Sequence, residues 1–297
     1  MNGRKSRLSK LSGWGKIVVL VLVVVLPVRF FLLEPCHIVS PAMETAVWAG
    51  DFVLVNKIPG LRTPQRNGVV LFTSPLRKDS TARKLFLSRC IGMPGDTLEM
   101  TGGRLLVNGR EAPRSPDALA RYTVDNSVRD VLLSQLRRLD IPVREPELTD
   151  SVYVFSLTPF EEYRIRSEVP SFINDRFRAA PVEEYKLVVP RKGRAYRLDP
   201  VALKACQEII LSEAGPGAFV RDGKLFVDGR ETTFFFFNRD YYWLLSDNTL
   251  DAVDSRHLGF VPEEAIVGNA WLIWLSKDPS AGGLQGYRWN RLFNRVR

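Results

Sequence analysis

The first 33 residues constrain the chain most, because a basic start is followed by an uninterrupted apolar run. Positions 1–16 hold five Lys or Arg residues and no Asp or Glu, and the run IVVLVLVVVL occupies 17–26. As a helix, residues 17–33 would extend about 25 Å, near the lower limit for crossing a bilayer. Their single charge, Arg29, lies near the outer end, where a long side chain reaches the interface. We expect one transmembrane helix at 17–33.

The orientation of this helix follows from its flanks. Basic flanks stay in the cytoplasm, so we expect a cytoplasmic basic tail at 1–16 and a body on the outer, periplasmic side of a bacterial-type inner membrane. Two alternatives compete. A cleaved secretory signal would need small residues at a cleavage site, and none follows the apolar run. A lipoprotein signal ending at Cys36 would need small residues where Glu34 and Pro35 stand.

Charge and cysteine content exclude several classes of function. Six of the 42 Lys and Arg residues lie within 1–33, which leaves 36 against 33 Asp and Glu elsewhere, so the net charge of +9 is mostly local. A balanced body argues against nucleic-acid binding. Three widely spaced cysteines indicate free thiols, and two isolated histidines do not form a zinc motif. No metal or cofactor is implied.

Beyond residue 50 the pattern predicts a mainly β protein. The short apolar runs are typical of strands, and they lie at 52–55, 69–72, 85–91, 105–107, 186–189, 225–227, 241–245 and 270–275. Two similar segments, GRLLVNGRE at 103–111 and GKLFVDGRE at 223–231, carry Asn-Gly or Asp-Gly between strand-like residues, which predicts hairpins with primed turns. We interpret them as a recurring local hairpin and not as a domain duplication.

Two helices are expected. The first covers 200–214, where Asp199 suits the N-cap, Pro200 the first turn and Gly215 the stop. Leu203, Cys206 and Ile210 then share one face, so the Cys206 thiol is expected to pack in the core. The second covers 130–139, with three leucines at helical spacing. The stretch 113–190 is rich in proline and charge without a strong period, and we interpret it as part of an inserted subdomain.

The segment after the apolar run carries the most specific signal. Residues 34–57, EPCHIVSPAMETAVWAGDFVLVNK, resemble EPxxIPSGSMxPTLxxGDxxLVNK, the first signature of type I signal peptidases, without a gap. This register places Ala42 at the family's serine nucleophile. A methyl group cannot form the acyl-enzyme. Ser40 matches the family serine that assists the oxyanion.

The second signature, typically YIKRxxGLPGD, is similar to residues 86–96, FLSRCIGMPGD. Here Ser88 occupies the position of the lysine that serves as general base. A desolvated lysine amine can be neutral and accept a proton, and a serine hydroxyl cannot take over that role at neutral pH. The nearest lysine, Lys84, would sit roughly 13 Å away along a strand, and we interpret it as a solvated charge.

The third signature, typically GDNRxNSxDSR, is similar to residues 246–256, SDNTLDAVDSR. Ser246 replaces the glycine, Thr249 replaces the arginine, and Ala252 replaces the serine that supports the lysine. The matching residues are Asp247, Asn248, Asp254, Ser255 and Arg256. The resemblance implies a structural ion pair between Asp254 and Arg256.

Two further segments, 189–200 and 288–293, also resemble the long-insert branch of this family. The resemblance implies a signal-peptidase-like β-fold with a substrate groove at the membrane surface and an inserted α+β subdomain. We expect the first part of this core at 34–112, the inserted or appended subdomain at 113–240 and the second part of the core at 241–297.

Loss of nucleophile, base and supporting serine together predicts a non-catalytic homologue. In model serine proteases one such loss already costs about 10⁶-fold in rate. We expect a membrane-anchored protein that binds signal-peptide-bearing exported polypeptides, or an active signal peptidase or translocation partner, and no nucleic acid. The alternative is an active signal peptidase, a serine endopeptidase, that uses another nucleophile such as Ser40. The aromatic run at 234–237 could also contribute to a membrane-resting surface, although alternate members of a strand face the core.

Overall fold

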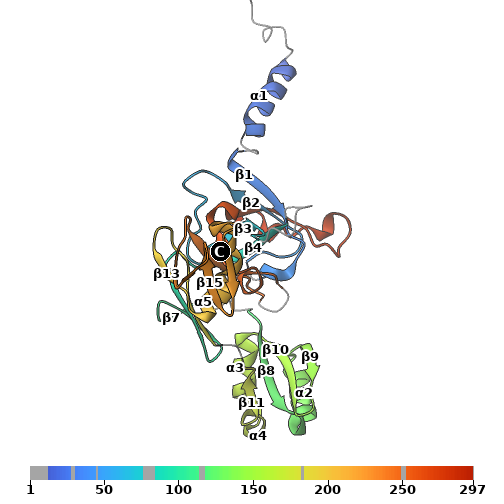
Figure 1. The fold of residues 1–297 in the computed structure, drawn as a ribbon. Helices are drawn as coiled ribbons and strands as arrows, with labels where there is room; N and C mark the ends of the chain where they lie inside the picture. The colour runs from blue at the N-terminus through green and yellow to red at the C-terminus, as the bar shows by residue number, and fades with distance from the viewer. Residues whose placement is uncertain are drawn as a thin grey trace, which may run out of the picture.

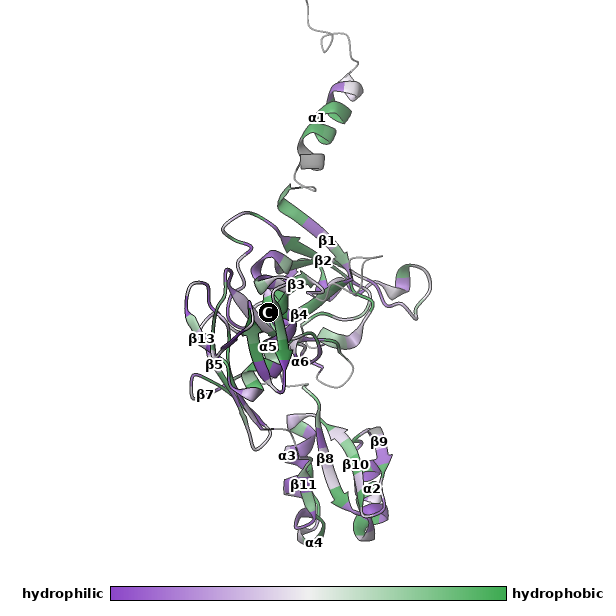
Figure 2. Ribbon diagram, in the orientation of Figure 1, coloured by the Kyte–Doolittle hydropathy of each residue, from purple (hydrophilic) through white to green (hydrophobic). Residues whose placement is uncertain are grey.

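The computed structural model describes residues 13–27, 31–44, 46–75, 84–113, 118–181, 184–248 and 252–296 (Figure 1). Antiparallel sheets dominate, which confirms the mainly β prediction. The first element is the helix α1 (Gly13–Pro27), which projects from the body and is apolar along most of its drawn length (Figure 2). The expected span at 17–33 runs past this helix, because Leu33 already pairs with Asn56 in a sheet. No helix among the described residues is both long and apolar enough to qualify as a membrane span.

The centre of the body is an eight-stranded antiparallel sheet. Its strands are, in spatial order, β1 (Leu33–His37), β2 (Asp51–Asn56), β20 (Ile266–Ser276), β3 (Val69–Thr73), β4 (Leu85–Gly92), β18 (Tyr241–Leu245) and β19 (Val261–Pro262), with β21 (Asn294–Arg295) pairing to β20. The β2–β20 and β18–β4 contacts join segments far apart in sequence. The chain therefore builds this sheet from both of its halves.

Period-two alternation gives this sheet two buried faces. Val69 and Leu71 of β3 pack in a cluster with Met43, whereas Val70 and Phe72 pack in a second cluster with Leu244. Burial on both faces explains why the sequences of these strands are continuous apolar runs.

The two similar segments of the sequence form the same local structure. A meander of β5 (Thr97–Thr101), β6 (Arg104–Val107) and β7 (Arg110–Glu111) has its counterpart in β14 (Ala218–Arg221), β15 (Lys224–Val227) and β16 (Arg230–Thr232). At the predicted turns Asn108, Gly109, Asp228 and Gly229 all have positive φ. Primed turns require this conformation, so both hairpin predictions are confirmed.

A third cluster packs the helix α5 (Pro200–Ala214) against the meanders and β18. The helix has the predicted bounds, with Asp199 accepting a hydrogen bond from the Ala202 amide, and its face of Leu203, Cys206 and Ile210 is buried. The aromatic run also alternates: Phe235 and Phe237 join the cluster, and Phe234 and Phe236 are exposed. The remaining strands here are β12 (Tyr185–Val188), β13 (Ala195–Arg197) and β17 (Phe234–Phe236).

Residues 118–181 have a core of their own. The sheet order is β11 (Phe177–Ala179), β8 (Ala120–Asp125), β10 (Val152–Leu157) and β9 (Arg144–Leu148), accompanied by α2 (Arg129–Arg138), α3 (Pro159–Glu168) and α4 (Ser171–Asn174). We call this unit the inserted subdomain. Its buried cluster draws members from within 118–181 alone, and the expected helix at 130–139 appears as α2 with Leu132 and Leu136 buried. The unit lies at the end of the body away from α1 (Figure 1).

Candidate functional site

The site is built around the loop that carries Ala42. Ser40 caps the short 3-10 helix Pro41–Met43, and its Oγ accepts a hydrogen bond from the Ala42 amide at 3.2 Å. Met43 is buried and anchors the loop, whereas the Ser40 side chain is exposed. The loop therefore presents Ser40 to solvent and holds the partly buried Ala42 beside it.

Segment 246–248 meets this loop directly. The Asn248 amide donates to the Ala42 carbonyl at 3.0 Å, and the Asp247 amide donates to Met43 Sδ at 3.4 Å. The first and third signatures, some 200 positions apart in sequence, are thus in direct contact.

The second signature supplies the buried hydroxyl of Ser88 from β4. Its Oγ lies 3.2 Å from Ser246 Oγ, and both side chains are buried. The two buried hydroxyls therefore satisfy each other by a hydrogen bond. Lys84, which precedes β4, is exposed, and its carbonyl accepts from the Ser74 amide.

Two carboxylates hold the third signature in shape. Asp247 forms a bidentate ion pair with Arg89, with distances of 2.8 and 2.6 Å. Asp254 is fully buried, accepts from the Ser246 amide at 2.9 Å, and forms a bidentate pair with Arg256. Charge-assisted bidentate pairs fix the relative orientation of the two side chains and also stabilise the contact. The Arg89 partner was not expected from the sequence, because only strand pairing places β4 beside β18.

The remaining members of the third signature differ in what they contribute. Ser255 begins α6 (Ser255–Leu258), and its Oγ accepts from the Leu244 amide at 2.9 Å. Ala252 is partly buried, and its methyl side chain has no hydrogen-bonding group. It cannot orient a base as a serine would.

A second network, centred on Asp51 and Arg291, holds the loop 41–50 in place. Asp51 is fully buried and accepts from Arg291 Nη2 at 2.5 Å and from the Trp48 amide at 2.8 Å. The Arg291 guanidinium lies 4.0 Å from the Trp48 ring centroid. The sequence indicated only that 288–293 resembles the family, without assigning this contact.

Gly50 lies in the same support and has a definite backbone reason for its identity. Its φ is +91°, and a Cβ there would lie 1.8 Å from the Lys277 carbonyl oxygen. No other residue fits this approach.

The cysteine next to the site is not an alternative nucleophile. Burial raises the pKa of Cys90 to about 12, and the thiolate is the nucleophilic form of cysteine. The Cys90 thiol stays protonated at neutral pH. Burial likewise raises the pKa of Cys206 to about 12, and this thiol contacts the Tyr196 hydroxyl within the core.

The fold and the site together define a mainly β protein in which Ala42, Ser88 and segment 246–248 are brought together by the central sheet and its loops. A family model described as signal peptidase, peptidase S26, matches residues 11–275. The chain therefore belongs to the signal peptidase (peptidase S26) family.

Relatives support this assignment over most of the chain. Signal peptidase I of Pseudomonas fluorescens is 27% identical over 291 residues, covering 90% of this chain and 73% of that protein. Signal peptidase I of Haemophilus influenzae is 26% identical over 283 residues, covering 93% and 73%. Signal peptidase I of Pseudomonas aeruginosa is 38% identical over a shorter stretch of 113 residues, which covers 33% of this chain and 38% of that protein.

Proposed function

We propose that this protein is a non-catalytic member of the signal peptidase family that binds signal-peptide-bearing polypeptides, or an active signal peptidase or translocation partner, in the groove beside Ala42. Two findings support this proposal: the family acts on preproteins, and hydrogen bonds hold together the segments 40–43 and 246–248, which would flank such a groove. We further propose a membrane anchor at 17–33, with the basic tail in the cytoplasm and the body outside.

The hydrogen bond between Ser88 and Ser246 carries the argument against catalysis. A general base at position 88 would need a long amine side chain in this buried place. Ser246 Oγ already lies against Ser88, so an added lysine would meet a filled, tightly packed neighbourhood, and overpacking of this kind costs about 1–3 kcal/mol. The substitutions at 88 and 246 thus fit each other and not a base.

An active enzyme that uses Ser40 is the second candidate. The exposed Ser40 hydroxyl favours it, because a nucleophile must be accessible to substrate. Against it, the Ser40 hydroxyl serves as the cap of the 3-10 helix, and within the described residues it makes no hydrogen bond to a Lys or His side chain that could act as base.

Cleavage of a preprotein tests both candidates. We expect the purified full-length protein to leave the preprotein intact. A variant with Ala42→Ser, Ser88→Lys, Ser246→Gly and Ala252→Ser should cut it, since it restores nucleophile, base, space and support together. Ala42→Ser with Ser88→Lys alone should be slower, because Ser246 still occupies the space beside position 88.

The control variants distinguish a non-catalytic binding protein from an enzyme that uses Ser40. Cleavage by the native protein that disappears in Ser40→Ala would overturn the proposal and establish the second candidate. Binding of an uncleaved signal peptide, measured by titration, should persist in Ser40→Ala and be lost in Ala42→Trp, which places a large side chain in the groove.

A further inference from the structure

A large cavity borders the strand β18, and its lining does not include Ser40 or Ala42. Its volume is about 1280 Å³, and it is lined by residues of the central sheet, α5 and the inserted subdomain. Of the described residues of the site, Arg89, Ser246, Asp247, Ser255 and Arg256 border it, whereas Ser40 and Ala42 do not. The cavity therefore reaches Asp247, whose amide contacts Met43, but its lining does not include Ser40 or Ala42.

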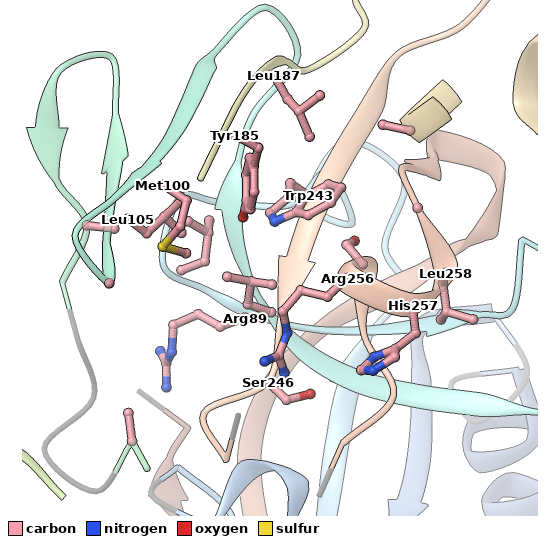
Figure 3. A pocket seen from close by; sticks show the side chains of 18 of the residues that line it. Arg89, Met100, Leu105, Tyr185, Leu187, Trp243, Ser246, Arg256, His257 and Leu258 are labelled. Carbon is pink, nitrogen blue, oxygen red and sulfur yellow. The ribbon is translucent and has the colours of Figure 1, made fainter. Parts of the chain in front are cut away.

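Two hydrogen-bonding groups in its wall lack partners. The Trp243 side chain is 4% exposed, and neither its Nε1 nor the Tyr185 hydroxyl has a hydrogen-bond partner within the described part of the chain. Both residues line the cavity, and Figure 3 shows their polar ends directed toward the same part of it. Buried polar groups without partners are rare in native proteins and unfavourable for stability.

The chemistry of these groups defines what they can bind. An indole N–H only donates. Burial raises the pKa of the Tyr185 hydroxyl, so this hydroxyl keeps its proton and can also donate. Two donors in one place call for a hydrogen-bond acceptor.

Most of the charged side chains around the cavity are paired with one another, and Lys204 and Glu208 add one charge of each sign to its lining. Arg256 pairs with Asp254 and Arg89 with Asp247 beside the two donors. Farther out, the wall carries the pairs Arg104 with Glu111, Arg121 with Glu147, and Arg239 with Glu213. An anion would have to compete with these carboxylates, so a neutral acceptor fits best.

The rest of the lining indicates the body of the ligand. Ile91, Met100, Leu105, Leu187 and Leu245 supply an apolar wall near the donors, which suits an apolar side chain. Polar and charged side chains lie along the wall on both the sheet side and the subdomain side. Such an alternation suits a chain with polar groups along its length better than an acyl chain with one polar end.

We propose that this cavity is a second binding site, which takes an uncharged apolar peptide segment with a main-chain carbonyl accepting hydrogen bonds from Tyr185 and Trp243. This inference goes beyond the proposed function and does not depend on the groove at Ala42. The cavity is larger than the roughly 300–1,000 Å³ of ordinary small-molecule pockets, which leaves room for several residues.

Calorimetric titration with the blocked peptide acetyl-Leu-Val-Leu-amide, which lacks the small residues of a cleavage site, tests the proposal. The full-length protein is reconstituted in lipid nanodiscs, since detergent would compete for an apolar cavity. Tyr185→Phe and Trp243→Phe remove one donor each and keep the ring. Each should weaken binding roughly tenfold and leave the melting temperature equal or higher. The matched controls Tyr163→Phe and Trp274→Phe change exposed rings outside the cavity and should bind as the native protein does.

Several results would overturn the inference. Unchanged affinity in both cavity variants would do so, as would tighter binding of decanoate than of the peptide, which would indicate an anionic lipid. Ala42→Trp separates this inference from the proposed function: it should block signal-peptide binding in the groove and leave binding of the short peptide unchanged.

Discussion

At the scale of single residues, the buried carboxylate of Asp51 has the strongest structural role near the site. It ties the loop 41–50 to Arg291, whose guanidinium also stacks on Trp48. We predict that Asp51→Asn lowers the free energy of unfolding by about 3 kcal/mol, because it leaves a largely buried arginine without its counter-charge. Urea denaturation measures this loss.

The matched change for Asp51→Asn is Asp278→Asn. Asp278 likewise pairs with an arginine, Arg288, at 3.6 Å, but this aspartate lies at the surface. Exposed ion pairs contribute about 0–1 kcal/mol to stability. Equal effects of the two substitutions would contradict the role assigned to burial of Asp51.

Residue identities in the site were readable from the sequence, and their partners were not. The register of the first signature placed Ala42, and the second placed Ser88. The contact of Ser88 with Ser246, however, spans 158 positions and depends on β4 pairing with β18. Local pattern indicates that both segments are strands, but it does not specify which strands become neighbours.

At the scale of elements, the start of α3 makes the inserted subdomain sensitive to acid. Burial raises the pKa of the Glu161 carboxyl, but hydrogen bonds from Arg144 and Thr158 outweigh burial and hold the pKa below its ordinary 4.5. The ionised carboxylate therefore contributes stability that is fully present above pH 4.5 and is lost as pH falls through the lowered pKa.

We predict that the inserted subdomain loses stability below pH 4.5 and that Glu161→Gln makes this loss shallower while lowering stability at pH 7. Residues 118–181 contain no tryptophan, so far-UV circular dichroism should change before tryptophan fluorescence does. Glu168→Gln, which removes a more exposed pair with Arg164, is the control. Identical acid profiles for both variants would contradict the prediction.

The helix α3 was not predicted from the sequence, although a helix-start signal precedes it. Thr158 and Glu161 form a capping box, a signal visible in the sequence as Thr-Pro-Phe-Glu, yet the many charges of 113–190 obscured the period. Strands β8, β9 and β11 were missed for a related reason, because each mixes charged residues with apolar ones. Strand β10 was missed although it is an apolar run with nearly every residue buried. Long apolar strands and the well-capped α5 were predicted because local and tertiary preferences agree there.

At the scale of the whole molecule, the inserted subdomain should be separable. Ala179 pairs with Tyr122, and the Ala180 amide donates to the Arg121 carbonyl, so its two ends are adjacent. We predict that replacing 119–180 by a short Gly-Ser linker leaves a folded core, with the tryptophan fluorescence transition shifted by only a few degrees. A core that fails to fold would contradict this. The division of the chain at 113 and 240 remains a prediction.

The ion pair between Asp51 and Arg291 also constrains the order in which parts of the protein fold during synthesis. A ribosome delivers the chain from its N-terminus at about 5–20 residues per second, so residues 41–51 emerge long before their partners. The inserted subdomain has a hydrophobic core built from residues within 118–181 alone and can form while synthesis continues. The loop at Ala42 must wait for β20 and for Arg291. A chain truncated before Arg291 therefore lacks the ion pair that holds the loop at Ala42, so this loop can reach its final structure only after residue 291 has left the ribosome.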